Sequence, residues 1–112
     1  AQLIITNSLL WTTIDLSGFS ADYRNFPLEQ FQYLHLENRL FRSVKHINLS
    51  NWNANQAIKI LEFFANCSEY NIHSLNISCC PNITVSFFQS IIVYIGNLHS
   101  LNISNITVSF KE

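Results

Sequence analysis

The chain has 112 residues, of which 48% are apolar and 12% are charged, and its formal net charge is −1. Charged residues usually make up about 25% of a globular domain, so this composition favours a piece of a larger protein, or a subunit whose faces are covered. The small net charge supplies no positive field and argues against nucleic acid as the main partner. Apolar runs such as residues 87–95 are shorter than the roughly 20 residues that a membrane span requires, and we expect no span.

The predicted elements alternate between short strands and helices. A loose strand pattern from Trp11 to Phe19 comes first. The stretch from Phe26 to Leu40 is interpreted as an insertion, with Pro27 in the first turn of a short helix. Apolar residues at steps of three and four then predict a helix that ends near Cys67.

The caps of the two later helices are also readable in the sequence. Asn53 is a suitable N-cap for the helix that ends near Cys67, and Thr84 is a suitable N-cap for a helix over residues 85–95. Gly96 follows as the predicted terminator of that second helix.

One nine-residue pattern occurs three times, at residues 44–52, 72–80 and 98–106. Two apolar residues alternate with polar ones in each copy, which is typical of a leucine-rich repeat. Because every return passes through a helix, the strands are predicted to be parallel. We therefore expect residues 1–112 to form about four repeats of an α/β leucine-rich-repeat solenoid, with a parallel β-sheet on its concave side and helices on its convex side. We also expect this domain to be a fragment of a longer solenoid.

The alternation assigns each strand residue to one side of the sheet. Two inward columns are predicted to enter the core: Ile14, Ile47, Leu75 and Leu101, and Leu16, Leu49, Ile77 and Ile103. The outward side chains form a small, polar face that we predict to bind a partner: Asp15, His46, Asn48, Ser50, Ser74, Asn76, Ser78, Ser100, Asn102 and Ser104. The asparagine column also fits a purely structural role, a ladder of hydrogen bonds between identical neighbours. The residues alone leave both interpretations open.

The last strand is predicted to expose an apolar edge, because the third full copy has a strand but no helix after it. The residues of this edge are Leu101, Ile103, Ile106 and Val108. We expect further repeats or another subunit to cover them.

The second copy continues as Cys79-Cys80-Pro81-Asn82-Ile83-Thr84 and resembles the cysteine-containing leucine-rich repeat. Cys80 takes the cysteine place and Ile83-Thr84 match, whereas Val85 stands where the family prefers Asp. The segment at residues 8–17, with its Leu10-Trp11 pair, is similar to the segment that follows the F-box in F-box and leucine-rich-repeat proteins.

This resemblance implies a non-catalytic interaction module of the ubiquitin conjugation pathway. In such substrate receptors of cullin-RING ubiquitin ligases, the F-box binds an adaptor and the repeats hold the substrate. Here the F-box is absent or reduced to its end at residues 1–10. Relatives that are structural subunits of large assemblies, such as the ciliary dynein regulatory complex, imply a scaffold as the alternative. Both alternatives place the protein inside the cell, in the cytoplasm or the cytoskeleton.

The remaining motifs point to no chemistry. His73 and His99 share one repeat position but lack further ligands for a metal, and we expect neither a metal nor a cofactor. No nucleophile, base and orienting acid stand in a recognisable arrangement, so we do not expect an enzyme. The odd set Cys67, Cys79 and Cys80 does not make a disulfide framework. Six glycosylation sequons keep a secreted, glycosylated repeat domain as a second alternative: Asn48, Asn66, Asn76, Asn82, Asn102 and Asn105.

Overall fold

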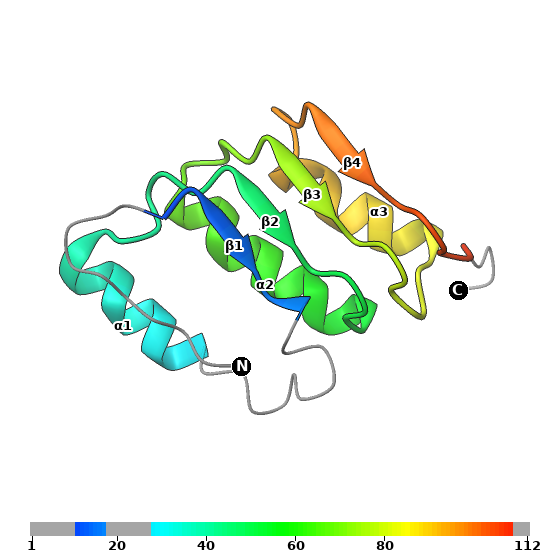
Figure 1. Cartoon of the computed structure of the whole chain (residues 1–112), viewed down its shortest axis with the longest axis horizontal. Helices are drawn as coiled ribbons and strands as arrows, with labels where there is room; N and C mark the ends of the chain where they lie inside the picture. Colours follow the sequence, from blue (N-terminus) through cyan, green and yellow to red (C-terminus); the bar gives the residue numbers. More distant parts are fainter. Residues whose placement is uncertain (1–10, 18–27, 109–112) are drawn as a thin grey trace.

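The computed structural model describes residues 11–17 and 28–108. The described residues form an α/β fold around a four-stranded parallel sheet, whose strand order β1-β2-β3-β4 follows the chain (Figure 1). The strands are short: β1 is Thr13–Asp15, β2 is His46–Asn48, β3 is Ser74–Asn76 and β4 is Ser100–Asn102. The predicted parallel arrangement is confirmed. The expected remnant of an F-box at residues 1–10 and the predicted helix start at Pro27 lie outside the described residues.

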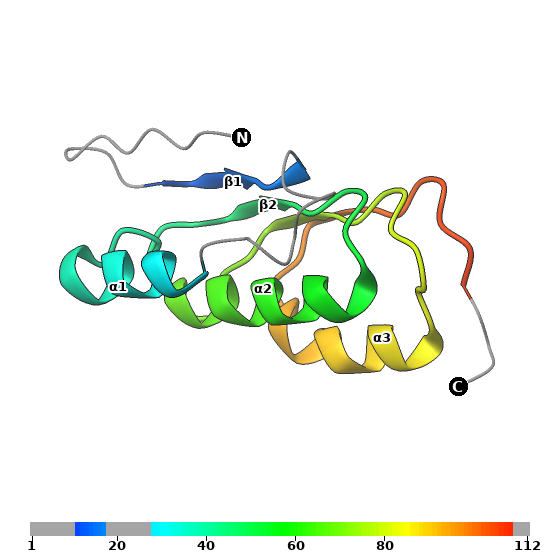
Figure 2. The same ribbon diagram turned by 90° about the horizontal axis from the view of Figure 1, so that it is seen from below.

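The helices lie together on one side of the sheet (Figure 2). They are α1 (Leu28–Asn38), α2 (Ala54–Cys67) and α3 (Val85–Ile91), and a 3-10 helix, η2 (Ile92–Tyr94), follows α3 directly. Among the described elements, no helix lies on the opposite side. The sheet therefore has a covered side and an open side.

The register of the sheet aligns the apolar columns. Ile14 pairs with Ile47, Ile47 with Leu75, and Leu75 with Leu101. In the first three strands the inward residues are buried as predicted, as are the partners two positions later: Leu16, Leu49 and Ile77. The alternation of apolar and polar residues thus turns the apolar side chains of β1, β2 and β3 toward the helices.

The fourth strand departs from this prediction. Leu101 is 40% exposed and Ile103 is 45% exposed, so their assignment to the core is wrong. The physical reason is that, in the described part of the chain, no helix follows β4 and packs against its apolar side chains. The same observation agrees with the expectation that these two residues form an exposed apolar edge, although Ile106 and Val108 are partly buried.

The helix caps are confirmed, but one helix is shorter than predicted. The Asn53 side chain accepts a hydrogen bond from the Asn55 amide at 2.9 Å, and α2 ends at Cys67. Thr84 Oγ1 accepts from the Phe87 amide at 3.1 Å, yet α3 ends at Ile91 and becomes a 3-10 helix.

Side-chain stiffness and exposure account for the shortened helix. Residues 91–93 are three β-branched residues in succession, which lose side-chain freedom in an α-helix. Ile92 and Val93 are each 65% exposed, so little packing compensates for that loss. Gly96 does not adopt a left-handed conformation, and the expected glycine terminator is therefore not the device that ends this helix.

An aromatic cluster positions the inserted helix α1. Phe41 lies at its centre, with ring centroids 5.4 Å from Phe31 of α1, 5.2 Å from Phe64 of α2 and 5.7 Å from Trp11. Phe31, Phe41 and Phe64 are all buried. Helix α1 therefore docks through aromatic packing, and the described residues of the insertion add no strand to the sheet.

Two side chains join successive repeats at the same place. Trp52 Nε1 donates to the Leu16 carbonyl oxygen at 2.7 Å, and Cys80 Sγ donates to the Leu49 carbonyl oxygen at 3.2 Å. Leu16 and Leu49 are themselves equivalent positions. Ile106 stands at the corresponding place in the last copy and has no side-chain donor to offer. The cysteine that marks the resemblance thus satisfies a buried carbonyl group.

We predict unequal losses of stability from two equivalent leucines. Replacing Leu75 by Ala should lower the free energy of unfolding by roughly 2 to 5 kcal/mol, because it leaves a cavity in a closed core. Replacing Leu101 by Ala should cost less than about 1.5 kcal/mol, because part of that side chain already meets water. Urea unfolding of both variants tests this. Equal losses would show that β4 is covered as fully as β3.

Candidate interaction surface

The ten predicted partner-binding residues come together on the open side of the sheet, which we call the open face. They alternate with the apolar residues of the two inward columns, and the parallel register brings equivalent positions side by side. The exposed members are Asp15, His46, Ser100, Asn102 and Ser104, and the partly buried members are Asn48, Ser50, Ser74, Asn76 and Ser78. The open face is small, polar and almost uncharged.

The asparagine column closes a turn at the end of each strand. The side-chain Oδ1 atoms of Asn48, Asn76 and Asn102 each accept a hydrogen bond from the amide two residues later, at 3.0, 2.9 and 3.0 Å. Asp15 makes the same bond to the Ser17 amide at 3.0 Å. The structural role is therefore a local turn within each repeat, a different arrangement from the ladder considered from the sequence.

The turn bonds leave part of each carboxamide available to a partner. In the described part of the chain, the Nδ2 atoms of these three asparagines donate no hydrogen bond. The open face thus carries a row of amide donors beside the serine hydroxyl groups.

The glycosylation sequons differ in their exposure. Two of the sequons, at Asn48 and Asn76, are partly buried and hold turn bonds, whereas Asn82 and Asn105 are exposed.

Histidines gather where the strands of the open face begin. The rings of His73 and His99, which share one repeat position, stack with centroids 4.6 Å apart. His46 Nδ1 lies 2.8 Å from Ser74 Oγ on the neighbouring strand. Partial burial lowers the pKa of His73, and the positive charges of His99, Lys45 and His46 lower it further. Among the described residues, no group of three or more potential ligands forms a metal site.

The three cysteines differ in their exposure to solvent. Burial raises the pKa of the Cys67 thiol to about 11 and also raises the pKa of the Cys80 thiol. Cys79 is exposed and has φ = 59°, a left-handed conformation that the equivalent residues Asn51 and Asn105 share. Cys67 and Cys80 are both buried. Packing therefore explains two of these residues.

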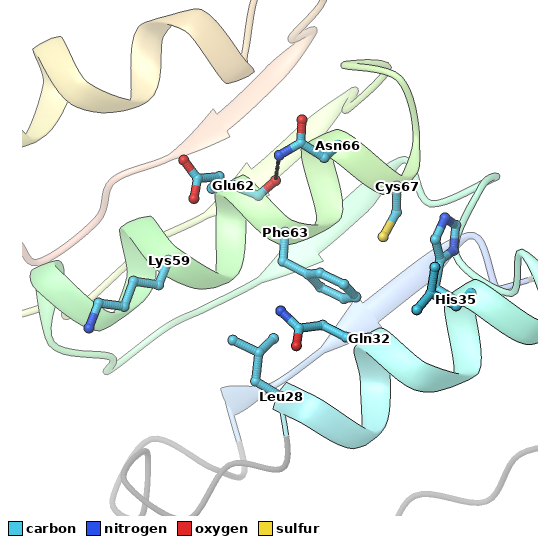
Figure 3. A pocket seen from close by; sticks show the side chains of 9 residues that line it. Leu28, Gln32, His35, Lys59, Glu62, Phe63, Asn66 and Cys67 are labelled. Carbon is cyan, nitrogen blue, oxygen red and sulfur yellow. Dashed lines mark hydrogen bonds between the residues drawn. The ribbon is translucent and has the colours of Figure 1, made fainter.

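A groove between α1 and α2 lies on the helix side of the sheet and was not foreseen from the sequence. Its volume is about 520 Å³. Figure 3 shows the side chains that α1 and α2 contribute to it. Its lining residues are Leu28, Gln32, His35, Leu36, Lys59, Glu62, Phe63, Asn66 and Cys67. The groove arises from the way in which α1 packs beside α2, and sequence periodicity does not encode that distance.

The polar groups around this groove serve structure. Partial burial lowers the pKa of His35, and the guanidinium groups of Arg39 and Arg42 lower it further. His35 Nδ1 accepts a hydrogen bond from the Phe41 amide at 3.3 Å. Tyr94 donates from its hydroxyl to Glu62 Oε2 at 2.6 Å, and this bond raises the pKa of Tyr94. These contacts tie the ends of helices to their neighbours.

Comparisons with protein-family models, with curated proteins and with solved structures found no match. Within the described residues, every helix falls short of the length and apolar character needed to cross a membrane.

We predict that one of the three thiols reacts rapidly in the folded protein. Cys79 should be labelled by a maleimide at the rate of an exposed thiol, whereas Cys67 and Cys80 should be labelled slowly, because they are buried. Mass spectrometry of labelled peptides over time measures the three rates. Replacing Cys79 by Ser should remove the fast phase, and rapid labelling of Cys80 would show that the repeat is misaligned.

We also predict that acidification lowers stability. His35 and His73 have lowered pKa values in the folded state, so the unfolded chain binds protons first as the pH falls. Their contribution to stability is complete above about pH 6.5 and is lost as the pH falls below that value. Urea unfolding across this range measures the slope.

A double variant tests the origin of that slope. Replacing His35 by Gln and His73 by Asn should make the dependence of unfolding free energy on pH shallower. Replacing Lys59 by Gln, which removes an exposed positive charge and leaves both histidines in place, should leave the slope unchanged. An equal slope in the double variant would contradict the assignment.

Proposed function

We propose that the chain is a non-catalytic protein–protein interaction module, a leucine-rich-repeat segment that receives its partner on the open face. The observation that carries this proposal is the division of the sheet into two unlike sides. Figure 2 shows the helices together on one side of the sheet. The residues that alternate with the inward apolar residues are small and polar, and they are exposed or partly buried on the other side. A polar surface that a packed scaffold presents to solvent suits recognition of another protein.

Equivalent backbone hydrogen bonds support the repeat assignment. Leu16, Leu49 and Ile77 each donate from the amide to a carbonyl oxygen of the next strand, at 2.9, 2.7 and 3.0 Å. The acceptors also occupy one repeat position: Asn48, Asn76 and Asn102. Successive units thus repeat these backbone bonds with their neighbours, as the proposed solenoid requires.

The resemblance to substrate receptors of cullin-RING ubiquitin ligases gives this module its proposed place. The residues that carry the resemblance have roles that fit a cysteine-containing repeat: Cys80 and Ile83 are buried, and Thr84 caps α3. In this role the chain holds a substrate while other subunits transfer ubiquitin. We assign the chain no covalent step and no cofactor.

A second candidate function is a scaffold subunit of a permanent assembly. The exposure of Leu101 and Ile103 favours it, because an apolar strand edge is normally covered by another strand or subunit. In this role β4 and the partly buried Ile106 and Val108 form the contact, and the open face is secondary. The two functions therefore place the main contact on different sides of β4.

Paired substitutions distinguish these functions. Replacing Ser100 by Arg places a bulky charge on the open face, and replacing Ser90 by Arg places the same group on the exposed side of α3. The tagged native protein and both variants are used to capture partners, which are quantified by mass spectrometry. We expect the Ser100 variant to lose most of the recovered partner, by about tenfold, and the Ser90 variant to retain it.

The identity and the sensitivity of the partners decide the outcome. Recovery of a ligase adaptor and of cullin with a partner that the Ser100 variant loses would support the receptor. Partners lost on replacing Leu101 by Asp, but retained by the Ser100 variant, would support the scaffold instead. Loss of the same partner from the Ser90 and Ser100 variants alike would contradict recognition by the open face.

A further inference from the structure

Three basic or titratable side chains occupy one repeat position along the start of the strands. They are Lys45, His73 and His99, which immediately precede β2, β3 and β4, and we call them the cationic column. The His73 amide donates to the Lys45 carbonyl oxygen at 2.7 Å, and the His99 amide donates to the His73 carbonyl oxygen at 2.7 Å. The three residues therefore lie on adjacent rungs of the sheet, about 4.8 Å apart.

The surroundings of His73, the central member of the column, disfavour its protonation. The charges that act on His73 come from His99, Lys45 and His46, and all of these are positive when protonated. His46 is the next residue after Lys45, and its ring is held against Ser74 Oγ at 2.8 Å. The His73 ring stacks on His99 and also contacts Asn71 Oδ1 through Nε2 at 3.1 Å. Like charges on neighbouring strands destabilise one another unless a negative group compensates them.

We propose that the cationic column, at the edge where the strands begin, binds an acidic peptide segment, rich in Asp or Glu, of the partner protein. This inference rests on the proposed function and names the chemistry of one part of the partner. Carboxylates placed along the column neutralise the repulsion between its rungs and favour the charged form of its histidines. Binding is therefore coupled to uptake of protons and tightens as the pH falls through the range in which histidine titrates.

Other ligands fit the column less well. A metal ion lacks a third ligand among the described residues. A nucleic acid requires a broad positive field, and the whole chain has a net charge of −1. A short acidic segment needs only the local charges of the column.

A titration with a defined probe tests the proposal. The probe is a fluorescein-labelled peptide of glutamates, and a peptide of glutamines with the same label is its control. Fluorescence polarisation is measured at low salt, where exposed charges are least screened. We expect the glutamate peptide to bind about five-fold more tightly at pH 5.8 than at pH 7.5, with folding at both values checked by circular dichroism.

Matched variants locate the binding site. Replacing Lys45 by Gln, together with His73 and His99 by Asn, should weaken binding at the lower pH by about five-fold or more. Replacing Lys59 by Gln removes one positive charge from the helix side and should change the affinity less than about two-fold. The single Lys45→Gln variant, measured beside Lys59→Gln, keeps the test decisive if the triple variant does not fold.

Several results would overturn the proposal. These are equal binding of the glutamate and glutamine peptides, an affinity that does not rise on acidification, and equal effects of the Lys45 and Lys59 variants. Binding of a phosphoserine peptide without binding of the glutamate peptide would replace the acidic segment by a phosphorylated one. The peptide titration and the partner capture fail independently, because the titration uses a purified peptide. If the glutamate peptide does not bind but the Ser100 variant still loses its captured partner, only the proposal of an acidic segment is rejected. If the peptide binds but the Ser100 variant loses no partner, only the proposed function is rejected.

Discussion

Backbone hydrogen bonds between equivalent positions of successive strands hold the whole arrangement in register. The amides of His73 and Ser74 share the Lys45 carbonyl oxygen, and those of His99 and Ser100 share the carbonyl oxygen of His73. A shift of one residue would turn every apolar side chain of a strand toward water and every polar one toward the helices. The burial of Ile14, the open face and the cationic column all follow from this one alignment.

The helix side adds a second constraint, which is the need to fill space between units of unequal length. The insertion between β1 and β2 provides α1, and the aromatic cluster around Phe41 holds that helix against α2. Trp52, at the end of the second unit, donates a hydrogen bond to the Leu16 carbonyl oxygen of the first unit. The larger Trp52 thus makes the link between the first two units, and the smaller Cys80 makes the equivalent link between the next two.

Much of this fold could be predicted because its signals are local. The alternation around Ile47 and Leu75 predicts buried strand residues, and the caps Asn53 and Thr84 depend only on the next few residues of the chain. These features hold in the structure. The open face follows from the same alternation, so the positions of its ten members could also be predicted.

Features that depend on packing between distant segments could not be predicted in this way. Leu101 has the same local pattern as Leu75, yet its exposure depends on what lies beneath β4. The early end of α3 depends on how little contact Ile92 and Val93 make. The groove beside Phe63 depends on the distance between two helices. Lys45 belongs to the cationic column because of its repeat position, and comparison of the three copies contained that signal.

The links made by Trp52 and Cys80 have a consequence for the way in which the structure opens. Each link ties a repeat to the one before it, and the last repeat lacks such a link because Ile106 has no donor. Regions with fewer buried contacts open locally at a lower free energy than the rest of a protein. Amide hydrogens around β4 should therefore exchange with solvent before those of β2 and β3, so that the molecule opens by peeling from this edge. A partner bound across the open face would then order the least stable strand, and slower exchange of its amides would record that binding.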